Sequence, residues 1–203
     1  MLGVIKCGGG NFKSVVNLLN YSNIKFKSVE NFSDFKNLNK VILPGVGSYK
    51  NLMNNLENAD IKNILYDKVC GQKIPFLGIC VGMQILSDFG YEFETTEGLK
   101  IISGEVKKIE TSTETLPNIG WHDIKLEKKD SPLFRNLSDD ELCFYFVHSY
   151  AFDVQDKRTV SSTINYGQKI SASIEKENIF GTQFHPEKSQ HSGMKLIHNF
   201  LKI

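Results

Sequence analysis

Short apolar runs alternate with helical patterns along the first half of the chain. Continuous apolar runs of four to six residues are typical of buried strands, and apolar positions spaced three and four apart are typical of one helix face. The strand-like runs are 2–5, 41–43 and 74–79, and the helical patterns fall at 12–19, 52–56 and 61–65. Strands that alternate with helices predict a parallel sheet covered on both faces.

The second half is richer in strand signals. Six short extended segments, divided by turn residues, follow Gly90. They are 99–109, 121–126, 142–147, 159–165, 170–174 and 179–184. The last segment, 190–201, spaces Met194, Ile197 and Leu201 as an amphipathic helix. We therefore expect an α/β fold, an open and mostly parallel sheet flanked by helices with an added antiparallel section.

The composition supports one domain with a small-molecule or protein partner. The 203 residues are 40% apolar, no repeat or Pro/Gly/Ser-rich linker divides them, and we expect one domain over 1–203. Lys and Arg number 24 against 23 Asp and Glu, which argues against nucleic acid or anionic membrane as the main partner. No signal peptide or span of about 20 apolar residues is visible, so a cytoplasmic location is expected.

The strongest chemical signal is Cys80, in Gly78-Ile79-Cys80-Val81-Gly82 directly after an apolar strand run. Small residues two before and two after a nucleophile let a strand turn sharply into a helix, the arrangement called a nucleophile elbow. The turn would leave the sulfur exposed above the strand ends, where a helix amino terminus and an imidazolium favour the thiolate. Cys80 is therefore the candidate nucleophile.

The alternative for each cysteine is a small core hydrophobe, as most free cysteines are. Cys7, Cys70 and Cys143 take that interpretation, because no CxxC pair or other zinc spacing joins the four. For Cys80 the flanking glycines would be costly in an ordinary strand or helix, and they favour the nucleophile.

A base for this nucleophile is available in Gln183-Phe-His185-Pro186-Glu187. Pro186 prevents a helix from continuing, so His185 and Glu187 would lie two apart on an extended segment and point the same way. A carboxylate beside an imidazole fixes its tautomer and favours the imidazolium. Cys80, His185 and Glu187 are the predicted triad, although a structural histidine beside a solvated carboxylate is the alternative.

The remaining histidines show no metal-ligand spacing, and we predict no metal site. They are His122, His148, His191 and His198.

Two glycine turns follow strand signals. The turn at 6–11 lacks the complete GxGxxG and Walker patterns, so a structural turn with Asn11 as helix N-cap is favoured. The turn at 43–48 contains Gly45, Val46 and Gly47. Because ligands of parallel sheets bind beyond the carboxyl ends of the strands, this second loop should lie near Cys80 and offer backbone N–H groups to an oxyanion.

Five segments together resemble the class I (triad) glutamine amidotransferases over essentially the whole chain, and within them the glutaminase subunits of histidine biosynthesis. They are PGVGSY at 44–49, PFLGICVGMQ at 75–84, PNIGW at 117–121, FYFVHSY at 144–150 and GTQFHPEKSQ at 181–190. The second and fifth segments contain the predicted triad.

The resemblance implies that Cys80 attacks the side-chain amide of L-glutamine, while His185 protonates ammonia and then activates water, and Glu187 orients the imidazole. It implies no cofactor. The residues implied in substrate binding and oxyanion stabilisation are Gly45, Val46, Gly47, Val81, Gln84, His148, Ser149 and Tyr150.

The family also implies a partner that receives the ammonia directly, because ammonia released into water becomes ammonium. That partner is a (β/α)₈-barrel synthase (cyclase) subunit, forming a heterodimer. The positions implied at or near the interface are Asn11, Trp121, Tyr145 and Lys188.

Lys6-Cys7 and His122 depart from the family pattern, which commonly has an acidic and an aromatic residue before the glycine turn and Asn after Trp121. A related synthase of surface-sugar biosynthesis therefore stays an alternative acceptor. A cysteine hydrolase of other specificity and a binding scaffold with a dead site are further alternatives, of which an intact triad disfavours the second.

Overall fold

The computed structural model describes residues 1–7 and 11–203, and the Gly8–Gly10 part of the first glycine turn lies outside them. Five parallel strands form one half of the main sheet in the order β2-β1-β3-β4-β14. Their bounds are β1 Leu2–Ile5, β2 Phe26–Val29, β3 Lys40–Gly45, β4 Phe76–Cys80 and β14 Ile179–Thr182. Every residue of β1, β4 and β14 is buried, which explains their continuous apolar runs.

Beyond β14 the sheet continues with antiparallel strands to a total of eight, in the order β14-β13-β12-β9. The added strands are β13 Gln168–Lys176, β12 Val160–Tyr166 and β9 Lys125–Leu126. The last parallel strand, β14, is thus fed by a hairpin from β13 rather than by a helix. This hairpin brings the 183–187 segment to the carboxyl end of the parallel half.

Two small antiparallel assemblies complete the strands, one pairing β8 with β10 and one ordered β11-β7-β5-β6. Their bounds are β5 Phe89–Gly90, β6 Thr96–Glu97, β7 Gly104–Lys108, β8 Asn118–Asp123, β10 Cys143–His148 and β11 Tyr150–Val154. Ser149 is the single residue between β10 and β11, so the chain passes from one assembly to the other at the FVHSY segment.

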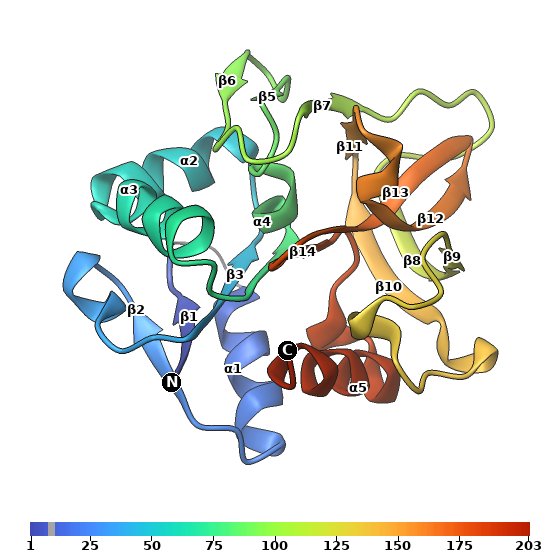
Figure 1. Ribbon diagram of the computed structural model, residues 1–203. Helices are drawn as coiled ribbons and strands as arrows, with labels where there is room; N and C mark the ends of the chain where they lie inside the picture. The colour runs from blue at the N-terminus through green and yellow to red at the C-terminus, as the bar shows by residue number, and fades with distance from the viewer. Residues whose placement is uncertain (8–10) are drawn as a thin grey trace.

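Helices cover the parallel half on both faces, with α1 and α5 side by side on one face and α2 and α3 on the other (Figure 1). The α-helices are α1 Asn11–Tyr21, α2 Tyr49–Asn58, α3 Ile61–Tyr66, α4 Val81–Gln84 and α5 Gln190–Leu201. A π-helical turn, Asp67–Gly71, follows α3. The 3-10 turns are Phe32–Phe35, Pro132–Phe134, Asp139–Glu141, Lys157–Thr159 and Pro186–Lys188.

The predicted fold class is confirmed, with four strands that the pattern did not reveal and one segment interpreted wrongly. The pattern missed β2, β5, β6 and β11. The expected strand over 99–109 is wrong in its first half, since only Gly104–Lys108 is a strand. The backbone N–H groups of Leu99 and Ile101 bond to Ile85 O and Leu86 O, just after α4. These bonds hold the 99–102 segment against the core, where both side chains are buried.

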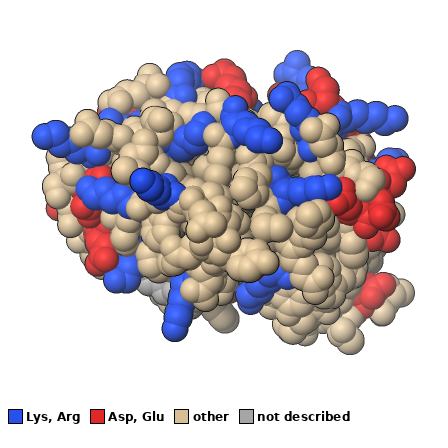
Figure 2. All heavy atoms as spheres, turned by 90° about the horizontal axis from the view of Figure 1, so that it is seen from below, with Lys and Arg blue, Asp and Glu red and all other residues tan. Residues whose placement is uncertain are grey.

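The surface charge agrees with the near-zero net charge of +1. On the face seen in Figure 2, Lys and Arg are interspersed with Asp and Glu around a largely uncharged centre. None of the helices in the described part of the chain is both long and apolar enough to cross a membrane.

Candidate active site

The turn from β4 into α4 is a strained elbow with Cys80 at its tip. Cys80 has φ 54° and ψ −110°, a conformation that costs a residue with a side chain about 1–3 kcal/mol. The next residue, Val81, is the first of α4. A strained residue in this position is the local feature that the glycine-flanked sequence predicted.

Three glycines make the close packing around this elbow possible. A Cβ on Gly78 would overlap with the Gly82 carbonyl, and a Cβ on Gly82 would overlap with the Leu43 carbonyl. A Cβ on Gly45 would overlap with the backbone N of Gly82. The elbow and the end of β3 therefore lie in direct backbone contact.

This contact places the second glycine loop beside the nucleophile, as predicted. Gly45 pairs with Cys80 at the carboxyl ends of β3 and β4. Gly47 has φ +94°, a conformation that favours glycine. Ser48 then caps α2 by accepting a hydrogen bond from Asn51 N.

His185 and Glu187 reach the same edge of the sheet from β14. His185 Nδ1 lies 2.7 Å from Glu187 Oε1, and their side chains are 0% and 1% exposed. The expected extended segment is wrong in detail, because Pro186–Lys188 forms a 3-10 turn with His185 at its N-cap. Since Pro at the first helical position needs no N–H bond, it starts this turn as readily as it stops a helix.

The electrostatics of His185 favour an imidazolium. Burial on its own lowers the pKa of His185, but the Cys80 sulfur and the Glu187 carboxylate outweigh it and raise the pKa to about 10. Nδ1 is engaged by Glu187, and Nε2 has no hydrogen-bond partner in the described part of the chain. Nε2 is therefore the nitrogen available to the sulfur and to a substrate.

Asn11 is a buried neighbour of this pair. It is the first residue of α1 and 3% exposed, and its Nδ2 donates to Glu187 Oε1 while lying 2.9 Å from His185 Nδ1. Its side chain thus holds the triad carboxylate, a role that the predicted N-cap did not include. Asn11 is therefore buried against His185 and Glu187.

A cavity of about 330 Å³ opens over the sulfur, within the usual size range of small-molecule sites, about 300–1,000 Å³. Cys80 is only 4% exposed, so the expected exposed thiol is wrong, because the cavity walls cover it on all but one side. The predicted site residues that line the cavity are Val46, Gly47, Cys80, Val81, Gln84, His148, Ser149, Tyr150 and His185. Gly45 and Glu187 lie just behind them.

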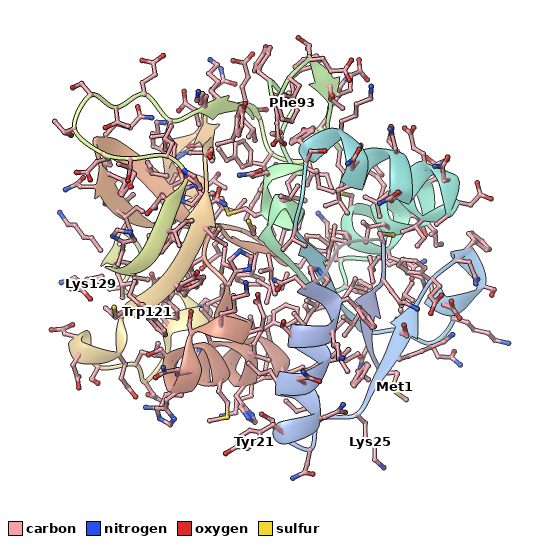
Figure 3. The ribbon with its side chains drawn as sticks, turned by 180° about the vertical axis from the view of Figure 1, so that it is seen from behind. Met1, Tyr21, Lys25, Phe93, Trp121 and Lys129 are labelled. Atoms are coloured by element: carbon pink, nitrogen blue, oxygen red, sulfur yellow. The ribbon has the colours of Figure 1, made fainter. Side chains whose placement is uncertain are left out.

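The hairpin of β5 and β6 contributes two cavity residues that the sequence did not reveal. Glu92 accepts a 2.8 Å hydrogen bond from the backbone N–H of Tyr49, at the start of α2. Phe93 is 91% exposed, and Figure 3 shows it in the loop of this hairpin. Tyr49 is packed between Gly90 and Gly98, where a Cβ would overlap with its ring and its hydroxyl. Contacts so distant in sequence leave no local signal.

His148 is a neutral, oriented histidine on the cavity wall. Burial lowers its pKa to about 4 and His185 adds to the effect, while a hydrogen bond to the Tyr150 carbonyl opposes it. Nδ1 donates to Tyr150 O at 2.9 Å, and Nε2 accepts from Asn118 Nδ2 at 3.2 Å. These two bonds fix the tautomer with the proton on Nδ1.

Trp121, Tyr145 and Lys188 form a partly exposed cluster beside the triad. The rings of Trp121 and Tyr145 meet edge to face at 5.9 Å, and Lys188 Nζ lies 5.6 Å from the centre of the Tyr145 ring. Trp121 is 46% exposed. The Tyr145 carbonyl accepts a 2.9 Å hydrogen bond from His185 N, so this cluster is joined to the catalytic segment.

The two departures from the family pattern have local partners. Lys6 forms an exposed ion pair with Glu30 at 3.0 Å. His122 packs edge to face against Phe146 and Tyr166, with ring centres 5.5 Å apart in each case, and its Nε2 lies 2.7 Å from Asn118 Oδ1. In the described residues no three His, Cys, Asp or Glu side chains gather as a metal site would require.

Sequence relatives share this organisation over their full length. Residues 3–203 match the model of the family described as glutamine amidotransferase class-I. The chain is 40% identical over 207 residues to "Imidazole glycerol phosphate synthase subunit HisH" of Leptospira borgpetersenii, covering 100% of both chains. It is 39% identical over 203 residues to the protein of the same name from Methanocaldococcus jannaschii, again covering 100% of both.

Solved structures agree on the fold at low sequence identity. A structure described as a glutamine amidotransferase matches with a TM-score of 0.75 and 18% identity, over 99% of this chain and 97% of the other. PurLQS from Thermotoga maritima matches with a TM-score of 0.72 and 18% identity, over 99% and 97%. The family match over residues 3–203, together with full-length relatives at about 40% identity, shows that the chain belongs to the class I glutamine amidotransferases.

Proposed function

We propose that this chain is the glutaminase subunit of imidazole glycerol phosphate synthase in histidine biosynthesis. The observation that carries the proposal is a cavity lined by Cys80 and His185, with Glu187 bonded to His185 behind it, in a chain whose full-length relatives bear that name. Residues 1–203 act as one glutamine amidotransferase domain. Because the relatives are subunits of a biosynthetic enzyme, we place this protein in the cytoplasm.

The proposed reaction begins when the Cys80 thiolate attacks the side-chain amide carbon of L-glutamine. The backbone N–H groups of Val81 and of the Gly45–Gly47 loop stabilise the oxyanion. The His185 imidazolium gives its proton to the departing ammonia, and the neutral ring then takes a proton from the water that hydrolyses the γ-glutamyl thioester. Glu187, held by Asn11, keeps the imidazole oriented through both steps.

Glu92 binds the α-ammonium group of the substrate in this proposal. It places a carboxylate in the wall of the cavity that the neutral His148 and the polar Ser149 and Tyr150 also line. A zwitterionic amino acid needs such a carboxylate for its ammonium group, because a buried charge without a partner is costly. Gln84, His148, Ser149 and Tyr150 form the rest of the proposed substrate site.

Replacing Glu92 with Gln should weaken glutamine binding and affect turnover less. The amide oxygen still accepts the Tyr49 N–H bond, so only the charge is lost. We expect the KM for glutamine to rise about thirtyfold or more, since removing one partner of a desolvated charge pair typically costs about 2 kcal/mol or more. Steady-state kinetics would measure this.

Glu94→Gln is the matched control for that variant. Glu94 lies two residues along in the same loop, where it pairs with Lys50 and its side chain is 54% exposed. It should leave the KM unchanged. Equal KM values for Glu92→Gln and the unaltered protein would remove Glu92 from the substrate site.

The proposed partner is a (β/α)₈-barrel synthase subunit that receives ammonia before water protonates it. The Trp121, Tyr145 and Lys188 cluster is the proposed docking surface, because it combines exposed aromatic area with a cation next to the triad. Ile119, 58% exposed two residues before Trp121 on β8, extends it. Asn11, the fourth position implied near the interface, is buried and donates a hydrogen bond to Glu187.

The proposal is tested by measuring glutamate and ammonia release from glutamine with and without the barrel subunit and its nucleotide substrate. We expect hydrolysis to rise at least about tenfold in the complex, a typical size for coupling between sites. No turnover of glutamine in that complex, with turnover in one containing a surface-sugar synthase, would favour the other acceptor. Hydrolysis of peptides or esters in place of glutamine would reject the glutaminase.

A further inference from the structure

A buried glutamine lies directly behind the nucleophile. Gln183 is 0% exposed and comes two residues before His185, and its Nε2 lies 3.6 Å from Cys80 Sγ. That distance is within the range of an N–H donor and a sulfur acceptor. Gln183 does not line the cavity, so its contact with the sulfur leaves the cavity side free for substrate.

The orientation of the Gln183 amide is fixed by a second glutamine. Gln84 Nε2 lies 2.9 Å from Gln183 Oε1 and 2.9 Å from the Tyr150 carbonyl, so both of its N–H bonds are used. An amide oxygen only accepts hydrogen bonds and an amide nitrogen only donates. With Oε1 occupied by Gln84, Gln183 presents an N–H group to the sulfur.

The other end of this network is also fully oriented. The Tyr150 carbonyl accepts from His148 Nδ1 as well as from Gln84, and His148 Nε2 accepts from Asn118. His122 Nε2 donates to the side-chain oxygen of Asn118, Oδ1. Each donor in this series meets an acceptor, which holds the Gln84 amide and hence the Gln183 amide in one orientation.

A sulfur anion is the partner that makes this arrangement useful. A thiol accepts hydrogen bonds weakly, whereas hydrogen bonds to ionised acceptors are roughly twice as strong as neutral ones. The second contact of the sulfur, the Val147 carbonyl at 4.0 Å, is an acceptor and gives the anion no stabilisation. The Gln183 N–H group and the His185 imidazolium would both stabilise a negative charge on the sulfur.

We propose that Gln183 donates a hydrogen bond to the Cys80 sulfur, stabilises its thiolate form and directs it toward the substrate cavity. Gln84 acts through Gln183 as a positioning residue. The inference deepens the proposed glutaminase function, because it assigns a hydrogen-bond donor to the nucleophilic sulfur. Its test does not need glutamine, so it is separate from the test of that function.

The test is the pH dependence of Cys80 alkylation by iodoacetamide, followed on the peptide that contains Cys80 by mass spectrometry. Gln183→Met keeps the length and burial but removes the donor, and Gln183→Glu keeps the acceptor for Gln84 and replaces the donor with a carboxylate. We expect the midpoint of the alkylation profile to move up by about one pH unit in Gln183→Met and further in Gln183→Glu. At high pH, where the thiol is fully ionised, the rates should converge.

Gln155→Met is the matched control, because Gln155 is an exposed residue away from the cavity. It should reproduce the alkylation profile of the unaltered protein. If both Gln183 variants are folded and keep the original midpoint, Gln183 is structural and the proposal is overturned. If Gln183→Met does not fold, the Gln183→Glu profile decides alone. A shifted midpoint in a protein that fails to hydrolyse glutamine in any complex would reject the glutaminase and retain the thiolate donor.

Discussion

We expect Cys80→Ala to abolish glutamine-dependent synthesis and to leave ammonium-dependent synthesis intact in a complex with the proposed barrel subunit. The substitution removes the sulfur that forms the thioester in the proposed mechanism, so glutamine hydrolysis should fall by roughly 10⁴-fold or more. The acceptor reaction needs ammonia only, which a high concentration of ammonium salt supplies without the triad. Glutamate release and product formation, measured side by side, separate the two reactions.

Cys143→Ala is the control for that experiment. Cys143 is a partly buried strand residue whose thiol pKa burial raises to about 11, and it lies outside the cavity lining. This variant should hydrolyse glutamine at the original rate. Persistent glutamine turnover in Cys80→Ala would reject the nucleophile, and loss of ammonium-dependent synthesis would show that the substitution had disturbed the complex.

Gly82→Ala should disrupt the elbow and with it both stability and activity. The added methyl group would overlap with the backbone carbonyl of Leu43, which no side-chain rotation relieves. Overpacking of this kind costs about 3 kcal/mol. For a chain of this size the cost corresponds to a fall in Tm of about 6–12 °C. Displacing the oxyanion donors should also lower glutaminase turnover about a hundredfold.

Gly71→Ala tests whether these effects belong to the elbow. Its Cβ would meet only the Asp67 side chain, at 3.0 Å, and that side chain can move. Its effect on the free energy of unfolding should stay within about 0.5 kcal/mol. Calorimetry and glutaminase assays on both variants make the comparison, and a stable, fully active Gly82→Ala would show that β3 and α4 are less tightly packed than described.

The sequence predicted the parts of the fold that depend on burial. The strands β1 and β4 are buried on both faces, so each reads as an uninterrupted apolar run. By contrast β2 is mostly half-buried, and Lys27 and Ser28 interrupt its apolar positions. β11 was missed because Ser149 alone separates it from β10. Residues 99–103 have the composition of a strand, but their apolar side chains are buried from a segment with irregular backbone.

The proposed catalytic residues could be selected from the sequence because their chemistry is local. Cys80 carries its glycines with it, and His185 and Glu187 are two residues apart. The residues that support them come from distant segments, as Asn11 does from α1 and Glu92 from the β5–β6 hairpin. Only Gln183 carried a usable signal, since a residue two before His185 on an extended backbone shares its side of the chain.

The hydrogen bonds of Tyr145 restrict how this surface can evolve. Its carbonyl holds His185 N and its N–H bonds to Ser189 Oγ, while its ring forms part of the aromatic cluster with Trp121. A substitution that moves the Tyr145 backbone would therefore also move the backbone of His185. If this cluster is the docking surface, as proposed, a change of synthase partner is coupled through Tyr145 to the position of His185.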